Sequence, residues 1–177
     1  MNALFSHAVV PGAESGDRSD LRAAVTVPAP ADHAWAGLTE HVHLWWPAGV
    51  LSRWGEDGFF DLEDNALVET SAQDDEYVWG EVTDGRPGHW LSLRWRHVGS
   101  DSVTQVLLEL TTQPGSAAGD TTSPARIENG TDMPESVSAL TLTHGGWSGA
   151  DAQDLYDFYR AFWPKALAAY QRFMGGS

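Results

Sequence analysis

The sequence contains no cysteine. This absence excludes disulfide bonds, thiolate zinc sites and cysteine nucleophiles. Basic residues are scarce as well: 10 Lys and Arg stand against 25 Asp and Glu, which gives a formal net charge of −15 over 177 residues. Because such a surface repels phosphate backbones and anionic lipid headgroups, we expect no nucleic-acid partner and no membrane partner.

Long hydrophobic runs are missing too. No stretch is apolar over the length that a membrane span needs, and residues 1–20 lack the basic segment and apolar run of a signal peptide. We therefore expect a cytoplasmic protein, a monomer or a homodimer, that uses no cofactor. Glycine, proline and serine in residues 1–20 predict a flexible tail, and residues 21–175 are long enough for one domain.

The end of the chain carries the strongest pattern. Between Ser148 and Met174, apolar residues recur every three or four positions, which predicts a long helix with one buried, unusually aromatic side. Pro164 lies inside this pattern and lacks the amide that would bond to Arg160. We therefore expect a kink, or a fresh helix start, near residues 162–163.

The middle of the chain alternates between apolar and polar residues instead. After a first strand and two short helices, consecutive alternating runs joined by short turns predict an antiparallel meander with one solvated face. The expected strands are 21–27, 59–62, 67–70, 77–83, 89–97, 103–112 and 137–144, and the expected short helices are 31–38 and 40–46.

Residues 113–136 interrupt the last hairpin without any apolar periodicity and are rich in glycine, proline and serine. This composition predicts a long mobile loop inserted into the hairpin, with an ordered, covered loop as the alternative. The expected fold class is therefore α+β: a curved antiparallel sheet wraps around the C-terminal helix and encloses an apolar cavity.

Five local motifs, in order along the chain, resemble the START-like, or SRPBCC, superfamily, and within it the branch of the activator of the heat-shock-chaperone ATPase. They are Ala29–Leu38, Trp45-Trp46-Pro47, Gly80–Trp95, Leu142–Trp147 and Trp163-Pro164. Two positions depart from the pattern: Phe162 replaces a glycine, and Gly85 replaces a hydrophobic residue. The resemblance implies a helix-grip fold with a cavity between sheet and helix, and it implies no single reaction.

Aromatic and aliphatic side chains on the inward faces are the candidate ligand-binding set. They are Trp46, Trp79, Leu93, Trp95, Leu108, Phe158, Phe162 and Trp163. The plainer interpretation is that they only fill the core, because protein interiors are normally filled. We favour a pocket, since rigid aromatic side chains between a helix and a curved sheet fill space inefficiently and ligand pockets are lined in this way.

Two residues are candidates for acid–base chemistry. His144 ends the last strand before two glycines, where it could transfer a proton or simply hydrogen-bond to the turn. Glu81 could face inward next to Trp79 with a raised pKa, or pair with Arg94 or Arg96 across the sheet. For His144 the hydrogen bond to the turn is the commoner outcome; for Glu81 both alternatives stay open.

His41 and His43, beside Glu40, are the closest approach to a metal site. On a helix, residues two apart point to nearly opposite sides, and nothing nearby completes a ligand set, so we expect no metal.

Three functions follow, in order of preference. The first is the binding of a hydrophobic or aromatic small molecule between helix and sheet. The second is a polyketide cyclase- or dehydratase-like enzyme that uses the same cavity. The third is a co-chaperone-like protein interaction module, which only the resemblance suggests.

Overall fold

Seven antiparallel strands and one long helix make up most of the computed structural model, which describes residues 17–63, 65–113 and 136–177. In chain order the elements are β1 (Leu21–Val27), α1 (Ala31–Thr39), α2 (Val42–Trp45), a 3-10 turn η1 (Gly55–Asp57), β2 (Phe59–Glu63), β3 (Ala66–Thr70), β4 (Glu76–Arg86), β5 (Trp90–Arg96), β6 (Val103–Gln113), β7 (Val137–Gly145) and α3 (Gln153–Phe173). The α+β helix-grip fold expected from the sequence is confirmed.

The strands form one sheet in the order β1-β7-β6-β5-β4-β3-β2. Strands β2 to β7 form a meander, and β1 joins it at the far edge by pairing with β7. Register shifts interrupt the β3–β4 pair after Leu67 and the β4–β5 pair after Val82. Such bulges bend a strand and increase its twist, so they help the sheet to curl.

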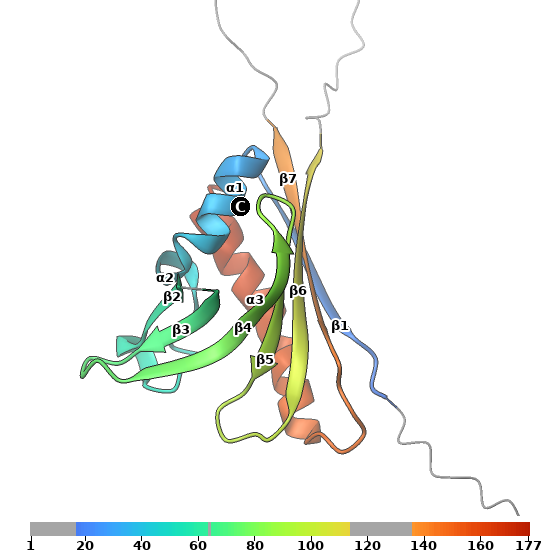
Figure 1. The fold of residues 1–177 in the computed structure, drawn as a ribbon. Helices are drawn as coiled ribbons and strands as arrows, with labels where there is room; N and C mark the ends of the chain where they lie inside the picture. Colours follow the sequence, from blue (N-terminus) through green and yellow to red (C-terminus); the bar gives the residue numbers. More distant parts are fainter. Residues whose placement is uncertain (1–16, 64, 114–135) are drawn as a thin grey trace, which may run out of the picture.

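Helix α3 lies along the concave side of this sheet, and α1 and α2 cover its C-terminal end (Figure 1). The buried face of α3 consists of Tyr159, Phe162, Trp163, Ala166, Leu167 and Tyr170. The hydroxyl of Tyr170 donates a hydrogen bond of 2.6 Å to the carbonyl of Ala34 in α1. A Cβ atom on Gly37 would lie 2.4 Å from Sδ of Met174, so glycine allows α1 to approach the end of α3 closely.

The long helix does not restart at Pro164. It is continuous from Gln153 to Phe173 with Pro164 inside it, so the expected fresh helix start is wrong. The proline ring lies on the exposed side of α3 with Lys165, while Trp163 and Ala166 are buried. Packing of the aromatic face against the sheet therefore outweighs the loss of one helical hydrogen bond.

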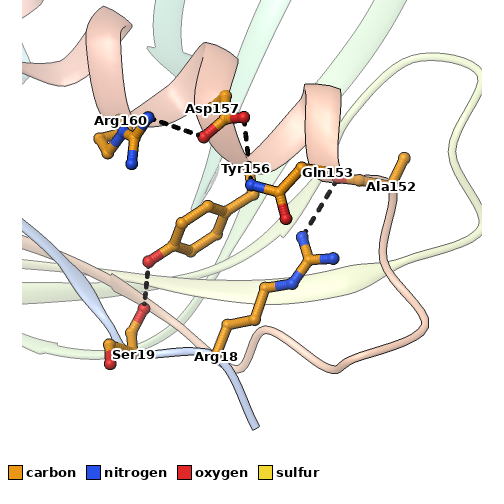
Figure 2. Close-up of polar contacts among 7 residues, drawn as sticks. All are labelled: Arg18, Ser19, Ala152, Gln153, Tyr156, Asp157 and Arg160. Atoms are coloured by element: carbon orange, nitrogen blue, oxygen red, sulfur yellow. Dashed lines mark hydrogen bonds and ion pairs between the residues drawn. The ribbon is translucent and has the colours of Figure 1, made fainter. Parts of the chain in front are cut away.

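The chain just before β1 is attached to the start of α3 (Figure 2). The guanidinium of Arg18 donates to the carbonyls of Asp151 at 2.7 Å and Ala152 at 3.4 Å, and it lies 5.4 Å from the ring centre of Tyr156. The hydroxyl of Tyr156 in turn donates to the carbonyl of Ser19 at 2.9 Å. These contacts involve the last residues of the expected tail; residues 1–16 lie outside the described part.

The expected insertion lies between two paired strands. Gln113 at the end of β6 pairs with Val137 at the start of β7, and residues 114–135 between them lie outside the described residues. Within the described part of the chain, no helix is both long and apolar enough to cross a membrane.

Replacing Pro164 by alanine restores an amide donor opposite the carbonyl of Arg160 without changing the buried face of α3. We expect the free energy of unfolding, measured with urea, to rise by about 1 to 3 kcal/mol. The control Lys165→Ala, at the next exposed position, should change it by less than about 0.5 kcal/mol. A loss of stability in Pro164→Ala would show that the proline is needed to seat the helix.

Candidate functional site

A small apolar cavity lies between the C-terminal half of α3 and the concave face of the sheet. Side chains from α1, α2, the β2–β3 hairpin, β5, β6, β7 and α3 surround it, and its volume is about 40 Å³. A single water needs roughly 10–15 Å³ by this measure, so the cavity has room for only a few atoms. The vacancy expected beneath the helix is therefore present, and it is narrow.

The structure divides the eight predicted ligand-binding residues between two places. Five of them line the cavity: Trp46, Leu93, Trp95, Leu108 and Trp163. The other three do not, and here the expectation needs correction. Trp79 and Phe158 line a separate hollow nearer the start of α3. Phe162 lines neither space, because it is fully buried against Phe158, with which it stacks, and against Trp46 and Trp163.

All four indole N–H groups at the cavity are already hydrogen-bonded inside the protein. The pairs are Trp45 to the Gly37 carbonyl at 2.9 Å, Trp46 to the Leu51 carbonyl at 3.0 Å, Trp95 to the Tyr159 hydroxyl at 2.8 Å and Trp163 to His144 Nδ1 at 2.9 Å. Thr39 is the single polar lining residue, and its hydroxyl donates to the Trp35 carbonyl. The cavity wall is therefore almost entirely carbon.

His144 is a buried structural residue. Trp163 Nε1 can only donate, so Nδ1 of His144 accepts its hydrogen bond, and the ring proton lies on Nε2, which donates to Thr104 Oγ1 at 2.7 Å. Burial lowers the pKa of His144 to about 3. With both nitrogens occupied and no exposed surface, His144 has no position from which to transfer a proton to a ligand. Its side chain bonds to the neighbouring strand β6 and to α3, and its backbone carbonyl accepts a hydrogen bond from Trp147 Nε1 in the following turn at 2.9 Å.

Glu81 lies on the outer face of the sheet. It pairs with Arg94 on the neighbouring strand β5, and the side chains of both residues are half exposed. This is the cross-strand pairing that the sequence left open as the alternative to an inward carboxylate. Neither candidate acid–base residue therefore reaches the cavity.

A second buried polar chain joins α3 to the sheet at Tyr159, and the sequence analysis did not identify it. The fully buried Tyr159 hydroxyl accepts from Trp95 Nε1 and lies 2.7 Å from His97 Nδ1. If His97 Nδ1 also donated to this oxygen, the buried hydroxyl proton would have no acceptor among the described residues. The hydroxyl therefore donates to His97 Nδ1, and neutral His97 keeps its own proton on Nε2. Burial lowers the pKa of His97, which favours this neutral form.

Glu69 is a second residue that sequence reasoning missed. Its carboxylate is fully buried and accepts hydrogen bonds from Trp79 Nε1 at 2.8 Å, from the Ser52 hydroxyl and from the backbone amides of Arg53 and Trp54. It therefore ties the loop between α2 and β2 to the sheet and orients the indole of Trp79.

Both missed residues continue an alternation that the sequence does show. His97 follows Leu91, Leu93 and Trp95 at intervals of two, and Glu69 follows Leu67 at the same interval. The sequence therefore predicts an inward position for both His97 and Glu69, but it does not predict their hydrogen-bond partners.

His41 and His43 remain far from a ligand geometry. Their ring centres are 6.2 Å apart with the planes nearly perpendicular, and both side chains are exposed on the surface around α2. Across residues 17–63, 65–113 and 136–177, no group of three or more His, Asp or Glu side chains could hold a metal ion.

No family model matches the chain, and no curated protein matches it. Solved structures do. Protein NE0264 from Nitrosomonas europaea is 15% identical over 88% of this chain and 94% of its own, with a TM-score of 0.52. The self-sacrificing resistance protein CalC from Micromonospora echinospora is 16% identical over 89% and 96%, with a TM-score of 0.53. The Aha1 dimer from Colwellia psychrerythraea is 12% identical over 89% and 96%, with a TM-score of 0.51.

At these identities the likeness concerns the fold alone. It agrees with the helix-grip fold of the START-like superfamily that the sequence motifs imply. The similar structures do not single out the branch of chaperone-ATPase activators.

The buried neutral His144 predicts a loss of stability in acid. Its folded pKa of about 3 lies below the value near 6.5 of an unfolded histidine, so the contribution is complete above pH 6.5 and is lost as the pH falls toward 3. Between pH 7.5 and pH 5.0 this one group should cost about 2 kcal/mol of unfolding free energy, measured with urea.

The variant His144→Gln does not titrate, so the difference in unfolding free energy between pH 7.5 and pH 5.0 should shrink by that amount. Absolute stability will fall as well, and only the pH dependence is diagnostic. His97→Asn serves as the comparison. Burial lowers the pKa of His97 as well, so its removal should reduce the pH dependence of stability in the same direction, and by less because His97 is only half buried. An unchanged slope in His144→Gln would contradict the assignment of a neutral His144.

Proposed function

We propose that the protein binds an apolar or aromatic small molecule between α3 and the sheet. The observation that carries this proposal is the carbon wall of the cavity. Every indole N–H at the wall is occupied by a protein acceptor, so a ligand gains there by burying apolar surface and by ring packing. A polar ligand group would lose its water and find no partner.

The size of the cavity sets a condition on binding. Ligand pockets usually measure about 300–1,000 Å³, and a cavity of about 150 Å³ holds benzene. At about 40 Å³, this cavity accepts a ring only if part of its wall moves. Leu93, Trp95 and Leu142 are fully buried on the sheet side, whereas Trp46 and Leu62 are partly exposed. The ligand therefore enters by displacing the wall on the side of α2 and the β2–β3 hairpin.

A cyclase- or dehydratase-like enzyme in the same cavity is the alternative function. It needs a group that transfers a proton to the bound molecule. Neither His144, which is hydrogen-bonded at both nitrogens, nor Glu81, which lies on the outer face, is placed for this step. Simple binding is therefore the function that the geometry supports better.

Assignment to the branch of chaperone-ATPase activators, and a protein-interaction role with it, rests on the sequence motifs. Stimulation of a chaperone ATPase by the purified chain would support it, and an unchanged ATPase rate would dismiss it. A cytoplasmic location likewise stays a prediction from the sequence.

Filling the cavity should block binding. Ala166 lines the cavity on α3 and is fully buried, whereas Ala161 is exposed on the same helix. We expect Ala166→Val to weaken binding of naphthalene roughly tenfold, equivalent to about 1.4 kcal/mol, and Ala161→Val to leave it unchanged. Both variants pay the same cost of a β-branched residue in a helix, and the added methyls of Ala166→Val should change the unfolding free energy by no more than about 1 to 3 kcal/mol.

Binding is followed through the indole N–H signals in NMR spectra of protein carrying ¹⁵N-labelled tryptophan. Naphthalene should shift the signals of Trp46, Trp95 and Trp163, which face the cavity, more than that of Trp90. The proposal fails if no cavity indole responds in the wild type, or if Ala166→Val and Ala161→Val bind naphthalene equally well.

A further inference from the structure

We propose that a second site, the outer hollow, binds a neutral aromatic molecule that carries a carbonyl or phenolic oxygen, with His97 Nε2–H as the hydrogen-bond donor. The outer hollow lies between the start of α3, the β5–β6 turn and the loop after α2. Residues at its wall include Leu51, Trp79, His97, Val98, Leu155 and Phe158. None of them lines the inner cavity, so this inference goes beyond the function proposed above.

The outer hollow is open and large. Its volume is about 570 Å³, which falls within the range of about 300–1,000 Å³ that small-molecule pockets occupy. Phe158, Leu155 and Val98 present partly exposed apolar surface there, and Val50 at the rim is 51% exposed. A flat apolar molecule can therefore bury carbon surface in it without any rearrangement of the core.

His97 supplies a ring N–H donor in a wall that also contains the polar residues Ser52, Ser100 and Asp154. The Tyr159 hydroxyl occupies Nδ1, so the proton of the neutral ring is on Nε2. Among the described residues, the only hydrogen bond of the His97 ring is the one at Nδ1, and the ring is only half buried. His97 is thus the counterpart of His144, whose two nitrogens are both occupied. A ligand oxygen can accept from His97 where it cannot from His144.

The imidazole is held in place before any ligand arrives. Three rings pack edge-on against it: Tyr159 at 5.5 Å between centres, Trp79 at 5.6 Å and Phe158 at 5.9 Å. Trp79 is itself oriented by its hydrogen bond to the buried Glu69 carboxylate. A donor fixed by its surroundings loses little entropy on binding and selects the ligand by the position of its oxygen.

Charge restricts the ligand further. The exposed Asp154 is an acidic residue at the wall, and no Lys or Arg lines the outer hollow. With a net charge of −15 on the chain, an anionic ligand would be repelled at the wall and from a distance. A cationic group could not accept the hydrogen bond that His97 donates. A neutral ring system with one acceptor oxygen matches all three features.

The matched probes fluorenone and fluorene test this assignment, since they share a ring skeleton and differ by one carbonyl oxygen. We expect the wild type to bind fluorenone about 3- to 10-fold more tightly than fluorene, the effect of one hydrogen bond. In His97→Asn, the shorter amide still offers an oxygen to the Tyr159 hydroxyl but removes the donor at the ε position. The preference for fluorenone over fluorene should disappear; any loss of ring surface weakens both probes alike, so the ratio of their affinities is the readout.

Phe158→Leu is the second variant, because it reduces the aromatic wall and keeps the donor. It should weaken both probes by the same factor and preserve their ratio. Near-ultraviolet circular dichroism shows whether each variant keeps its tertiary packing. Equal binding of the two probes to the wild type, or a preference for fluorenone that survives in His97→Asn, would overturn the proposal.

The two proposals fail separately. If Ala166→Val abolishes fluorenone binding and His97→Asn does not affect it, the molecule sits in the inner cavity and the outer-hollow site is refuted. If naphthalene shifts no cavity indole while fluorenone still depends on His97, the inner-cavity function is refuted and the outer-hollow site stands.

Discussion

Two buried hydrogen-bond chains hold α3 in register on the sheet, and the rest of the architecture depends on them. One runs from Trp163 through His144 to Thr104, and the other joins Trp95 and His97 through the Tyr159 hydroxyl. Aromatic packing alone is weakly directional and would tolerate a sliding or rotating helix. A helix moved by one residue would leave these buried donors unpaired, at about 1 to 3 kcal/mol for each.

The same bonds decide what the interior offers a ligand. The chains use the indole N–H groups of Trp95 and Trp163 and both nitrogens of His144, and the carbonyls of Gly37 and Leu51 accept those of Trp45 and Trp46, so almost no polar contact is left in the inner cavity. Recognition there depends on shape and apolar area. His97 Nε2, which neither chain uses, belongs to a ring outside this cavity, where the sheet ends and the outer hollow begins. Rigid seating of α3 and a nonpolar cavity are thus two results of one arrangement.

The fold was predictable because its burial is one-sided. Alternation places Leu91, Leu93 and Trp95 on one face of a strand, and a spacing of three and four places Trp163 and Leu167 on one face of a helix, whatever the partners are. The distribution of the aromatic residues between cavity, hollow and solid packing was not predictable. It depends on bulges in the sheet and on the path of the loop after α2, which the pattern does not encode.

The hydrogen-bond partners of buried polar groups could not be predicted from the sequence either. His144 and Glu81 looked similar as isolated titratable residues at inward or ambiguous positions. Their environments differ because the His144 ring has one donor, Trp163, and one acceptor, Thr104, 2.7–2.9 Å away, while Glu81 faces an arginine on the solvated side of the sheet. Such a difference arises only when strands far apart in the chain are brought together.

The loop after α2 connects the two spaces and sets the cost of opening the inner one. Leu51 lines the outer hollow, and its carbonyl accepts the N–H of Trp46, which forms the wall of the inner cavity. The next residues of the loop are fixed to the buried Glu69 carboxylate, so the loop cannot simply follow a displaced Trp46. A ligand that moves the Trp46 ring must break the bond to Leu51 and the stacking on Phe60 at 5.0 Å. For the binding we propose, the apolar area that the ligand buries must outweigh both losses, and that threshold would favour large, flat ligands over small ones.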